Sequence, residues 1–255
     1  MKRKFVFRII ALLAAVTLFS ACSAKPAKKA HRNSEQINKV VATNVRLATI
    51  YMQRNQLNYA KEKADRALQA DPNSSQANNM MALLKWRLQQ YEEADKYFRV
   101  AVRLQSSNSS ALNNYGAFLC DRGKIDQSLR YFDRAVQNPL YKNRSQALTN
   151  AGRCLIKKPD AEKAKTYFRR ALKFNRNESE ALLQLAKLSY QSDRMLTARA
   201  FMQRYLGTGR KTAESLYLAL RIERAMGNKQ AAIRYARKLQ QEFPASSEAS
   251  RVDNR

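Results

Sequence analysis

The sequence predicts an all-α protein in which six helix–turn–helix repeats stack into a superhelical solenoid. A small residue placed four positions before an aromatic or apolar partner recurs at intervals of 34, 34, 36, 34 and 34 residues. A second small or apolar site follows each partner by three residues, and a break in the helical pattern stands halfway through each unit. A fixed period of this length indicates a repeat array, because one unit cannot bury its apolar face alone.

The predicted second helix of each repeat carries the recurring small residue. It is Ala60, Ala94, Ser128, Ala164, Ala198 and Ala232. Its partners are Ala64, Phe98, Phe132, Phe168, Met202 and Ala236, and the sites that follow are Ala67, Ala101, Ala135, Ala171, Tyr205 and Leu239. We expect the small residues to let paired helices approach closely, and the phenylalanines to fill the space toward the next repeat.

The predicted first helix of each repeat carries a matching pair of residues. These pairs are Leu47–Ala48, Met81–Ala82, Tyr115–Gly116, Ala151–Gly152, Leu185–Ala186 and Ala219–Leu220. The two helices must be joined at Asn55, Gln89, Gly123, Pro159, Asp193 and Gly227. Most of these residues are strong turn formers, and Pro72, Pro139 and Pro244 are placed to end second helices.

This pattern resembles the tetratricopeptide repeat, a helix–turn–helix unit of about 34 residues. The resemblance covers roughly residues 41 to 244, with repeats expected to start near residues 41, 75, 109, 145, 179 and 213. We therefore assign residues 38–244 to a domain of six repeats, and residues 245–255 to a polar, frayed tail.

The N-terminus has the layout of a secretory signal peptide, assigned to residues 1–21. A basic start precedes a short apolar run from Ile9 to Phe19, and small residues then lead to Cys22. The Ser-Ala-Cys ending resembles the bacterial lipoprotein signal, which implies that Cys22 is acylated and becomes the first residue of the mature chain. Because Ser23 follows instead of an aspartate, that resemblance implies sorting to the outer membrane, facing the periplasm. The alternative is an ordinary signal peptide with an incidental cysteine.

Residues 22–37 are basic and contain almost no large apolar side chain, so we expect a flexible tether there. The whole chain has a formal charge of +28, divided as +15 over residues 1–149 and +13 over residues 150–255. An excess spread over both halves favours a broadly solvated basic surface. The alternative is electrostatic help in docking to acidic lipids, peptidoglycan or an acidic partner protein.

Two further cysteines, Cys120 and Cys154, fall at similar heights on the first helices of the third and fourth repeats. The pattern leaves two states open, a disulfide in an oxidising periplasm or two buried free thiols. The only histidine is His31, in the expected tether, so no histidine-based triad or HExxH zinc site is possible. We expect no enzyme activity, cofactor, metal site, small-molecule substrate or nucleic-acid partner.

The resemblance to the repeat family implies that first helices line a concave groove that binds a helix or an extended peptide of a protein partner. The groove positions carry over to Asn79, Leu83, Trp86, Asn113, Ala117, Cys120, Thr149, Arg153, Leu183, Lys187, Tyr190, Tyr217, Arg221 and Arg224. Trp86, the only tryptophan, is either an exposed interface anchor or an ordinary packing residue.

The third and fourth repeats carry a more specific resemblance. The run Asn113–Cys120 is followed by Tyr131–Phe132, Asn138–Tyr141, Asn150–Cys154 and Tyr167–Leu172. These segments resemble the type IV pilus biogenesis and stability lipoproteins of the PilF/PilW family. The resemblance implies a pilotin, which binds the secretin subunit, carries it to the outer membrane and promotes its multimerisation. Two alternatives remain: an adaptor lipoprotein for peptidoglycan synthases, hydrolases or proteases, and a basic protein that binds anionic polymers directly.

Overall fold

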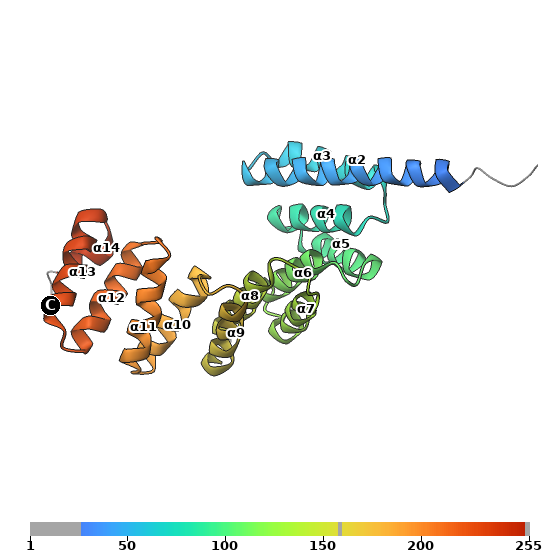
Figure 1. Ribbon diagram of the computed structural model, residues 1–255. Coiled ribbons are helices and arrows are strands. Elements are labelled where there is room, and N and C mark those ends of the chain that lie inside the picture. Colours follow the sequence, from blue (N-terminus) through green and yellow to red (C-terminus); the bar gives the residue numbers. More distant parts are fainter. Residues whose placement is uncertain (1–26, 158–159, 253–255) are drawn as a thin grey trace, which may run out of the picture. The chain divides into compact units, whose positions relative to one another are not determined.

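The computed structural model describes residues 27–157 and 160–252 (Figure 1). Within these ranges every regular element is a helix, which confirms the predicted all-α class. None of the described helices combines the length and hydropathy needed to cross a bilayer. The predicted signal peptide, Cys22 and the turn residue Pro159 lie outside the described residues.

The helices alternate as first and second members of successive pairs. The elements are α2 (Ala27–Gln53), α3 (Leu57–Ala70), α4 (Ser75–Arg87), α5 (Tyr91–Leu104), α6 (Ser109–Asp121), α7 (Ile125–Gln137), α8 (Arg144–Lys157), α9 (Ala161–Phe174), α10 (Ser179–Gln191), α11 (Met195–Gly207), α12 (Ala213–Ala225), α13 (Lys229–Glu242) and α14 (Ser247–Ser250). The chain divides into two compact units, with the boundary between Met80 and Met81 inside α4.

The first unit consists of α2, α3 and the start of α4. Its core gathers Val41, Ala67 and Ala77, with Ile37 and Val45 packed against them. Helix α2 already begins at Ala27, so the predicted flexible tether of residues 22–37 is wrong from that point onward. The segment from Ala27 to Ile37 has no proline or glycine, and seven of its eleven residues are alanine, lysine, arginine, glutamate or glutamine, which favour helix even with little apolar surface to bury.

The second unit runs from Met81 and contains the remaining pairs in chain order. Within it, each second helix packs on the first helix that follows, as α7 does on α8, α9 on α10 and α11 on α12. Consecutive first helices also touch, so that α6, α8, α10 and α12 form one continuous row. Most of the predicted repeat core is buried: Phe98, Phe132 and Phe168 are fully enclosed, Met202 takes their place in the fifth repeat, and Ala236 in the sixth is partly buried.

Close helix crossings depend on Gly116 and Gly152. A Cβ added at Gly116 would lie 3.0 Å from the ring of Phe132, and one added at Gly152 would lie 2.6 Å from the ring of Phe168. The ring of the second helix therefore occupies the volume that any larger residue would need. Two of the three repeats with a phenylalanine partner, those of Phe132 and Phe168, therefore need glycine at this site, whereas the repeat of Phe98 has Ala82 there.

The predicted turn residues close the helix pairs with left-handed backbone. Asn55, Gln89 and Asp193 have φ of 58°, 60° and 56°, and Gly123 and Gly227 have φ of 75° and 72°. After each of them, an amide reaches back five residues to a carbonyl, as from Gln56 N to Tyr51 O at 2.8 Å and from Arg194 N to Ser189 O at 2.9 Å. This pattern is the Schellman motif, which satisfies the last carbonyl groups of a helix.

Residues 245–252 are ordered, so the expected frayed tail is wrong for this described part of the C-terminal segment. Ser246 caps α14 by accepting a hydrogen bond from Ala249 N. Ala249 and Val252 are buried against Leu216, Leu220 and Leu239 of the last helix pair. Two apolar residues in an otherwise polar stretch are enough to cover the exposed end of the final repeat, as repeat arrays require.

Tyrosine hydroxyls connect neighbouring repeats. Tyr167 on α9 donates a hydrogen bond of 2.7 Å to Asp133 Oδ2 on α7, and Arg170 Nη1 binds the other oxygen of the same carboxylate at 3.0 Å. Tyr115 on α6 donates in the same way to Asp95 Oδ1 on α5, at 2.8 Å. Burial, followed by the hydrogen bond to Asp133, raises the pKa of Tyr167 to about 12.

Candidate protein-binding site

The row of first helices carries two pockets, and most of the predicted groove residues in the second unit line them. The first pocket has a volume of about 280 Å³ and lies over α4, α6 and α8. Its lining consists of Trp86, Ala117, Cys120, Asp121, Phe132, Asn150, Arg153 and Cys154. Four of the predicted groove residues therefore line one cavity: Trp86, Ala117, Cys120 and Arg153.

Trp86 forms one wall of this pocket and is half-buried. Its Nε1 donates a hydrogen bond of 3.1 Å to Asp121 Oδ2, and its ring meets Phe118 edge-on at a centroid distance of 5.7 Å. The indole is thus held in one orientation by a polar and an apolar contact while part of it still lines the cavity. The two interpretations of Trp86 left open by the sequence, packing residue and exposed surface, both describe part of its surroundings.

A disulfide between Cys120 and Cys154 forms the floor of the same pocket and ties α6 to α8, with 5.8 Å between the two Cα atoms. The structure therefore takes the first of the two states that the sequence left open. Cys154 is fully buried, and its sulfur lies 3.2 Å from Ser128 Oγ. The bridge fixes the spacing of the two helices that carry Ala117 and Arg153.

Amide side chains continue the lining along the same helices. Asn150 Nδ2 donates to Asn113 Oδ1 across α8 and α6 at 3.1 Å, and Gln146 Nε2 donates to Asn150 Oδ1 at 3.2 Å. Asn113 was predicted as a groove residue, whereas Asn150 and Asp121 were missed. Asn150 stands one position after Thr149, whereas Asp121 occupies a copied family position that was left out of the predicted set; the polarity of the two residues alone did not separate them from ordinary surface residues.

The second pocket, of about 370 Å³, lies over α10 and α12. Its lining contains the predicted residues Lys187, Tyr190, Tyr217 and Arg221, together with Gln191, Glu214 and Leu218. The guanidinium of Arg221 lies 4.8 Å from the centre of the Tyr190 ring and 5.9 Å from that of Tyr217. Lys187 Nζ pairs with Glu214 Oε1 at 2.6 Å. The two aromatic rings and two cations, of which Lys187 is neutralised by Glu214, make this a surface suited to peptide contacts.

Other predicted groove residues lie elsewhere. Thr149 is fully buried and cannot meet a partner, so this prediction is wrong; Leu183 is 7% exposed and lines neither pocket. Both side chains turn toward the packed side of their helices. The family's groove positions lie at the border between the apolar face and the exposed face of each first helix, so some of them fall on the buried side. Arg224 is exposed, but its Nη2 reaches Val252 O at 3.4 Å, next to the C-terminal cap. Asn79 is half-exposed on the part of α4 that belongs to the first unit, and Leu83 is half-buried against the core of the second.

The described residues contain no group of three or more His, Cys, Asp or Glu side chains that could hold a metal ion. The pockets combine aromatic rings, amides and solvent-accessible cations, among them Arg153, whose side chain is 61% exposed. These are groups that bind another polypeptide through stacking, hydrogen bonds and ion pairs.

Comparison with known proteins agrees with this architecture. Models of the tetratricopeptide repeat match residues 45–111 and 79–143, residues 145–178, and residues 211–246. The type IV pilus assembly protein PilF of Pseudomonas aeruginosa is 29% identical over 204 residues, which cover 80% of this chain and 81% of that protein. A solved structure of Pseudomonas aeruginosa PilF superposes with a TM-score of 0.76 at 27% identity, covering 86% of this chain and 99% of the other.

The crystal structure of PilW, a widely conserved type IV pilus biogenesis factor, is 30% identical and has a TM-score of 0.72. It covers 84% of this chain and 98% of the PilW chain. The protein belongs to the PilF/PilW family of tetratricopeptide-repeat proteins in type IV pilus biogenesis. The fold is thus the predicted tetratricopeptide solenoid, and the resemblance read from the third and fourth repeats is confirmed at family level.

More distant structures share the fold alone. YrrB, a tetratricopeptide-repeat protein with an unusual peptide-binding site, has a TM-score of 0.58 at 18% identity and covers 75% of this chain. That match covers 98% of the YrrB chain, so PilF and PilW differ from YrrB in their larger share of this chain, 86% and 84%, and in their higher TM-scores. Tetratricopeptide-repeat proteins mediate protein–protein interactions, and PilF and PilW are repeat proteins of type IV pilus biogenesis.

Proposed function

We propose that this PilF/PilW protein is a lipid-anchored pilotin of the outer membrane that binds the type IV pilus secretin through the row of first helices. The observation that carries the proposal is the pair of pockets around Trp86 and Arg221, set on the helices that carry groove residues in tetratricopeptide repeats. Family membership supplies the pilus context. The secretin as partner, the pilotin role and the membrane location are the parts that experiment must decide.

The anchor in this proposal is an acylated Cys22. Several acyl chains hold a protein to a bilayer far more firmly than one chain does. The lipid then provides a membrane address for a secretin subunit that lacks one, while the repeats bind that subunit on the periplasmic side. Replacing Cys22 with alanine is expected to remove both the protein and secretin multimers from the outer-membrane fraction. Normal levels of secretin multimers in that fraction would refute transport by this route.

The binding surface is tested separately with a photo-reactive amino acid. We place it at Ala117, which borders the first pocket, and, as a matched control, at Arg130, which is exposed on the second helix α7. Illumination of cells that assemble pili is expected to capture the secretin from position 117 and not from position 130. Capture from position 130 alone would move the partner to the opposite face, and capture of a cell-wall enzyme would favour the adaptor alternative.

A further inference from the structure

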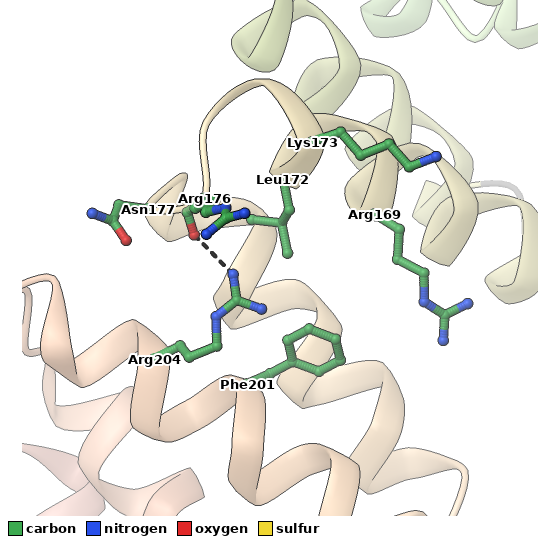
Figure 2. A pocket seen from close by; sticks show the side chains of 7 residues that line it. All are labelled: Arg169, Leu172, Lys173, Arg176, Asn177, Phe201 and Arg204. Carbon is green, nitrogen blue, oxygen red and sulfur yellow. Dashed lines mark hydrogen bonds between the residues drawn. The ribbon is translucent and has the colours of Figure 1, made fainter.

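A further cavity lies on the second helices α9 and α11, which do not line the pockets described above. A cavity of about 800 Å³ is lined by Arg169, Leu172, Lys173, Arg176, Asn177, Phe201 and Arg204 (Figure 2). Arg169, Leu172 and Lys173 come from α9, Phe201 and Arg204 come from α11, and the other two come from the connection between α9 and α10. The cavity therefore spans the fourth and fifth repeats.

The charge around this cavity has one sign. Arg169, Lys173, Arg176 and Arg204 are all exposed, and no carboxylate belongs to the lining. Among the described residues, none of these four cations forms an ion pair, whereas the neighbouring Arg170 is neutralised by Asp133. The sequence shows the same bias: residues 163–177 and 195–213 contain no aspartate or glutamate at all. The Glu162 carboxylate interacts with Arg169 at longer range. Four cations around a hollow with no carboxylate in its lining attract an anionic ligand.

The floor of the cavity is apolar. Leu172 is 8% exposed, and Phe201 is partly buried against the same core. A ligand that satisfied only the cations would leave these two side chains in contact with water. A fitting ligand therefore carries carboxylates around an aliphatic or aromatic group, since such a ligand covers the floor and pairs with the rim.

Arg204 is held in place before any ligand arrives. One of its terminal nitrogens donates a hydrogen bond of 2.9 Å to the Arg176 carbonyl, and its guanidinium lies 5.9 Å from the centre of the Phe201 ring. A guanidinium has five N–H donors, so this contact leaves donors for a carboxylate in a fixed fork geometry. Fixing the side chain beforehand lowers the entropy lost on binding.

We infer that this cavity, the α9–α11 basic pocket, binds an acidic segment of a partner protein, with carboxylates on the four cations and an apolar side chain on Leu172 and Phe201. The inference does not rest on the proposed secretin contact, because different helices form the two surfaces. The volume of the α9–α11 basic pocket lies within the range of pockets that hold several chemical groups of a ligand at once. A single phosphate would fill only part of it. A surface that binds a flat membrane needs cations that project from the protein. The four cations here surround a hollow with an apolar floor, which suits a protein segment better than a membrane. A second copy of the chain, with the same +28 formal charge, is repelled.

The test measures binding of a fluorescein-labelled peptide with two glutamates on each side of a Leu–Phe pair to the purified full chain in neutral detergent. Fluorescence anisotropy is expected to show saturable binding that weakens as salt is raised. A peptide with glutamines in place of the glutamates, and one with alanines in place of Leu–Phe, are each expected to bind at least about tenfold more weakly. Equal binding of all three peptides would overturn the inference.

The variant Arg169→Glu/Lys173→Glu reverses two exposed rim charges and is expected to weaken peptide binding at least about tenfold. The milder Arg169→Gln/Lys173→Gln is expected to fall between it and the unaltered protein. The matched control is Arg237→Glu/Lys238→Glu on α13, which makes the same change in net charge at two exposed positions outside the pocket. An equal loss in the control would overturn the inference, because net charge alone would then explain binding.

A competition experiment with lipid distinguishes the inferred peptide binding from binding to an anionic membrane. Micelles doped with phosphatidylglycerol are added as a competitor to the bound peptide. Peptide that stays bound at lipid concentrations matching its own carboxylate concentration supports the inference. Displacement of the peptide, together with micelle association that Arg169→Glu/Lys173→Glu abolishes, would overturn it in favour of a membrane-binding surface.

Discussion

The ring of Phe168 occupies the space in which a side chain on Gly152 would begin, because a Cβ there would lie 2.6 Å from Phe168 Cε1. Phe168 is fully buried, so its ring has no free volume into which to move. The crossing of α8 and α9 therefore depends on the absence of one carbon atom.

We expect Gly152→Ala to lower the free energy of unfolding by about 1–3 kcal/mol, the usual cost of overpacking a core. Gly116→Ala, whose Cβ would lie 3.0 Å from the Phe132 ring, is expected to cost less. Urea unfolding followed by circular dichroism measures both changes. Gly207→Ala is the control, since nothing lies within 4 Å of its Cβ position and alanine favours helix. A cost for Gly207→Ala equal to that of Gly152→Ala would contradict the steric explanation.

The disulfide between Cys120 and Cys154 closes a loop over a sequence separation of 34 residues. In the chain-entropy model, a loop of this length contributes about 3–4 kcal/mol. Reduction is expected to lower the urea midpoint by a corresponding amount, and the variant Cys120→Ala/Cys154→Ala is expected to show no further response to reductant. Two reactive thiols in denatured, unreduced protein would show that the bridge is not formed in solution.

Alkaline pH is expected to destabilise the fold through Tyr167. Its folded-state pKa of about 12 lies above its ordinary value of 10.0, so folding favours the protonated phenol. The corresponding stability is fully present below pH 10 and is lost as the pH rises toward 12. Tyr167→Phe is expected to be less stable at pH 7, because Asp133 loses a donor, and its stability should fall less steeply across this window. Unfolding free energies at pH 8, 10 and 11 measure the difference; parallel curves for the two proteins would rule out this role.

A nearly buried ion pair joins the fifth and sixth repeats. Arg199 Nε lies 3.0 Å from Glu223 Oε1, and the Glu223 side chain is only 3% exposed. Arg199→Leu leaves this carboxylate without its partner and is expected to cost about 3–5 kcal/mol. The double variant Arg199→Leu/Glu223→Leu is expected to recover a large part of that loss, since no charge then remains buried. Additive effects of the two single substitutions in chemical unfolding would show that the pair is not coupled.

Trp86 provides a built-in reporter of the first pocket, because it is the only tryptophan and forms part of the wall. If the secretin binds there, its periplasmic part is expected to shift the tryptophan emission to shorter wavelength and to reduce quenching by acrylamide. Ala117→Arg, which fills the pocket from its border, is expected to abolish both effects. An unchanged spectrum at saturating secretin would place the contact away from this pocket.

Sequence periodicity predicted most of the fold, because three kinds of residue repeat with the same period. Small residues permit close helix packing, aromatic residues fill the core, and turn residues join the helices. Asn55, Gln89 and Asp193 take left-handed backbone where the pattern placed the turns. The similar heights of Cys120 and Cys154 on adjacent helices left a disulfide and two free thiols open, and the structure has the disulfide. These features depend on local chemistry and on the register between neighbouring repeats, which a regular period specifies.

Other features depend on details that a period does not contain. Thr149 faces the core although the copied family position is a groove position, because a small rotation of α8 decides which side its edge residues take. Helix α2 extends to Ala27 through intrinsic propensity, in a segment where the absence of apolar residues favoured a tether. Charge summed over each half of the chain hid the α9–α11 basic pocket, which arises from two acid-free stretches about one repeat apart.

The short helix α14 has a consequence for protein engineering. Ala249 and Val252 pack on the last helix pair. An extra repeat appended in the same register would therefore first have to displace α14 and Val252. Grafting longer arrays onto the C-terminal side would therefore mean deleting residues 246–252 and transferring their sealing role to the new terminal unit. Truncating the chain before residue 246 without such a replacement would expose the apolar surface of the last helix pair and favour self-association.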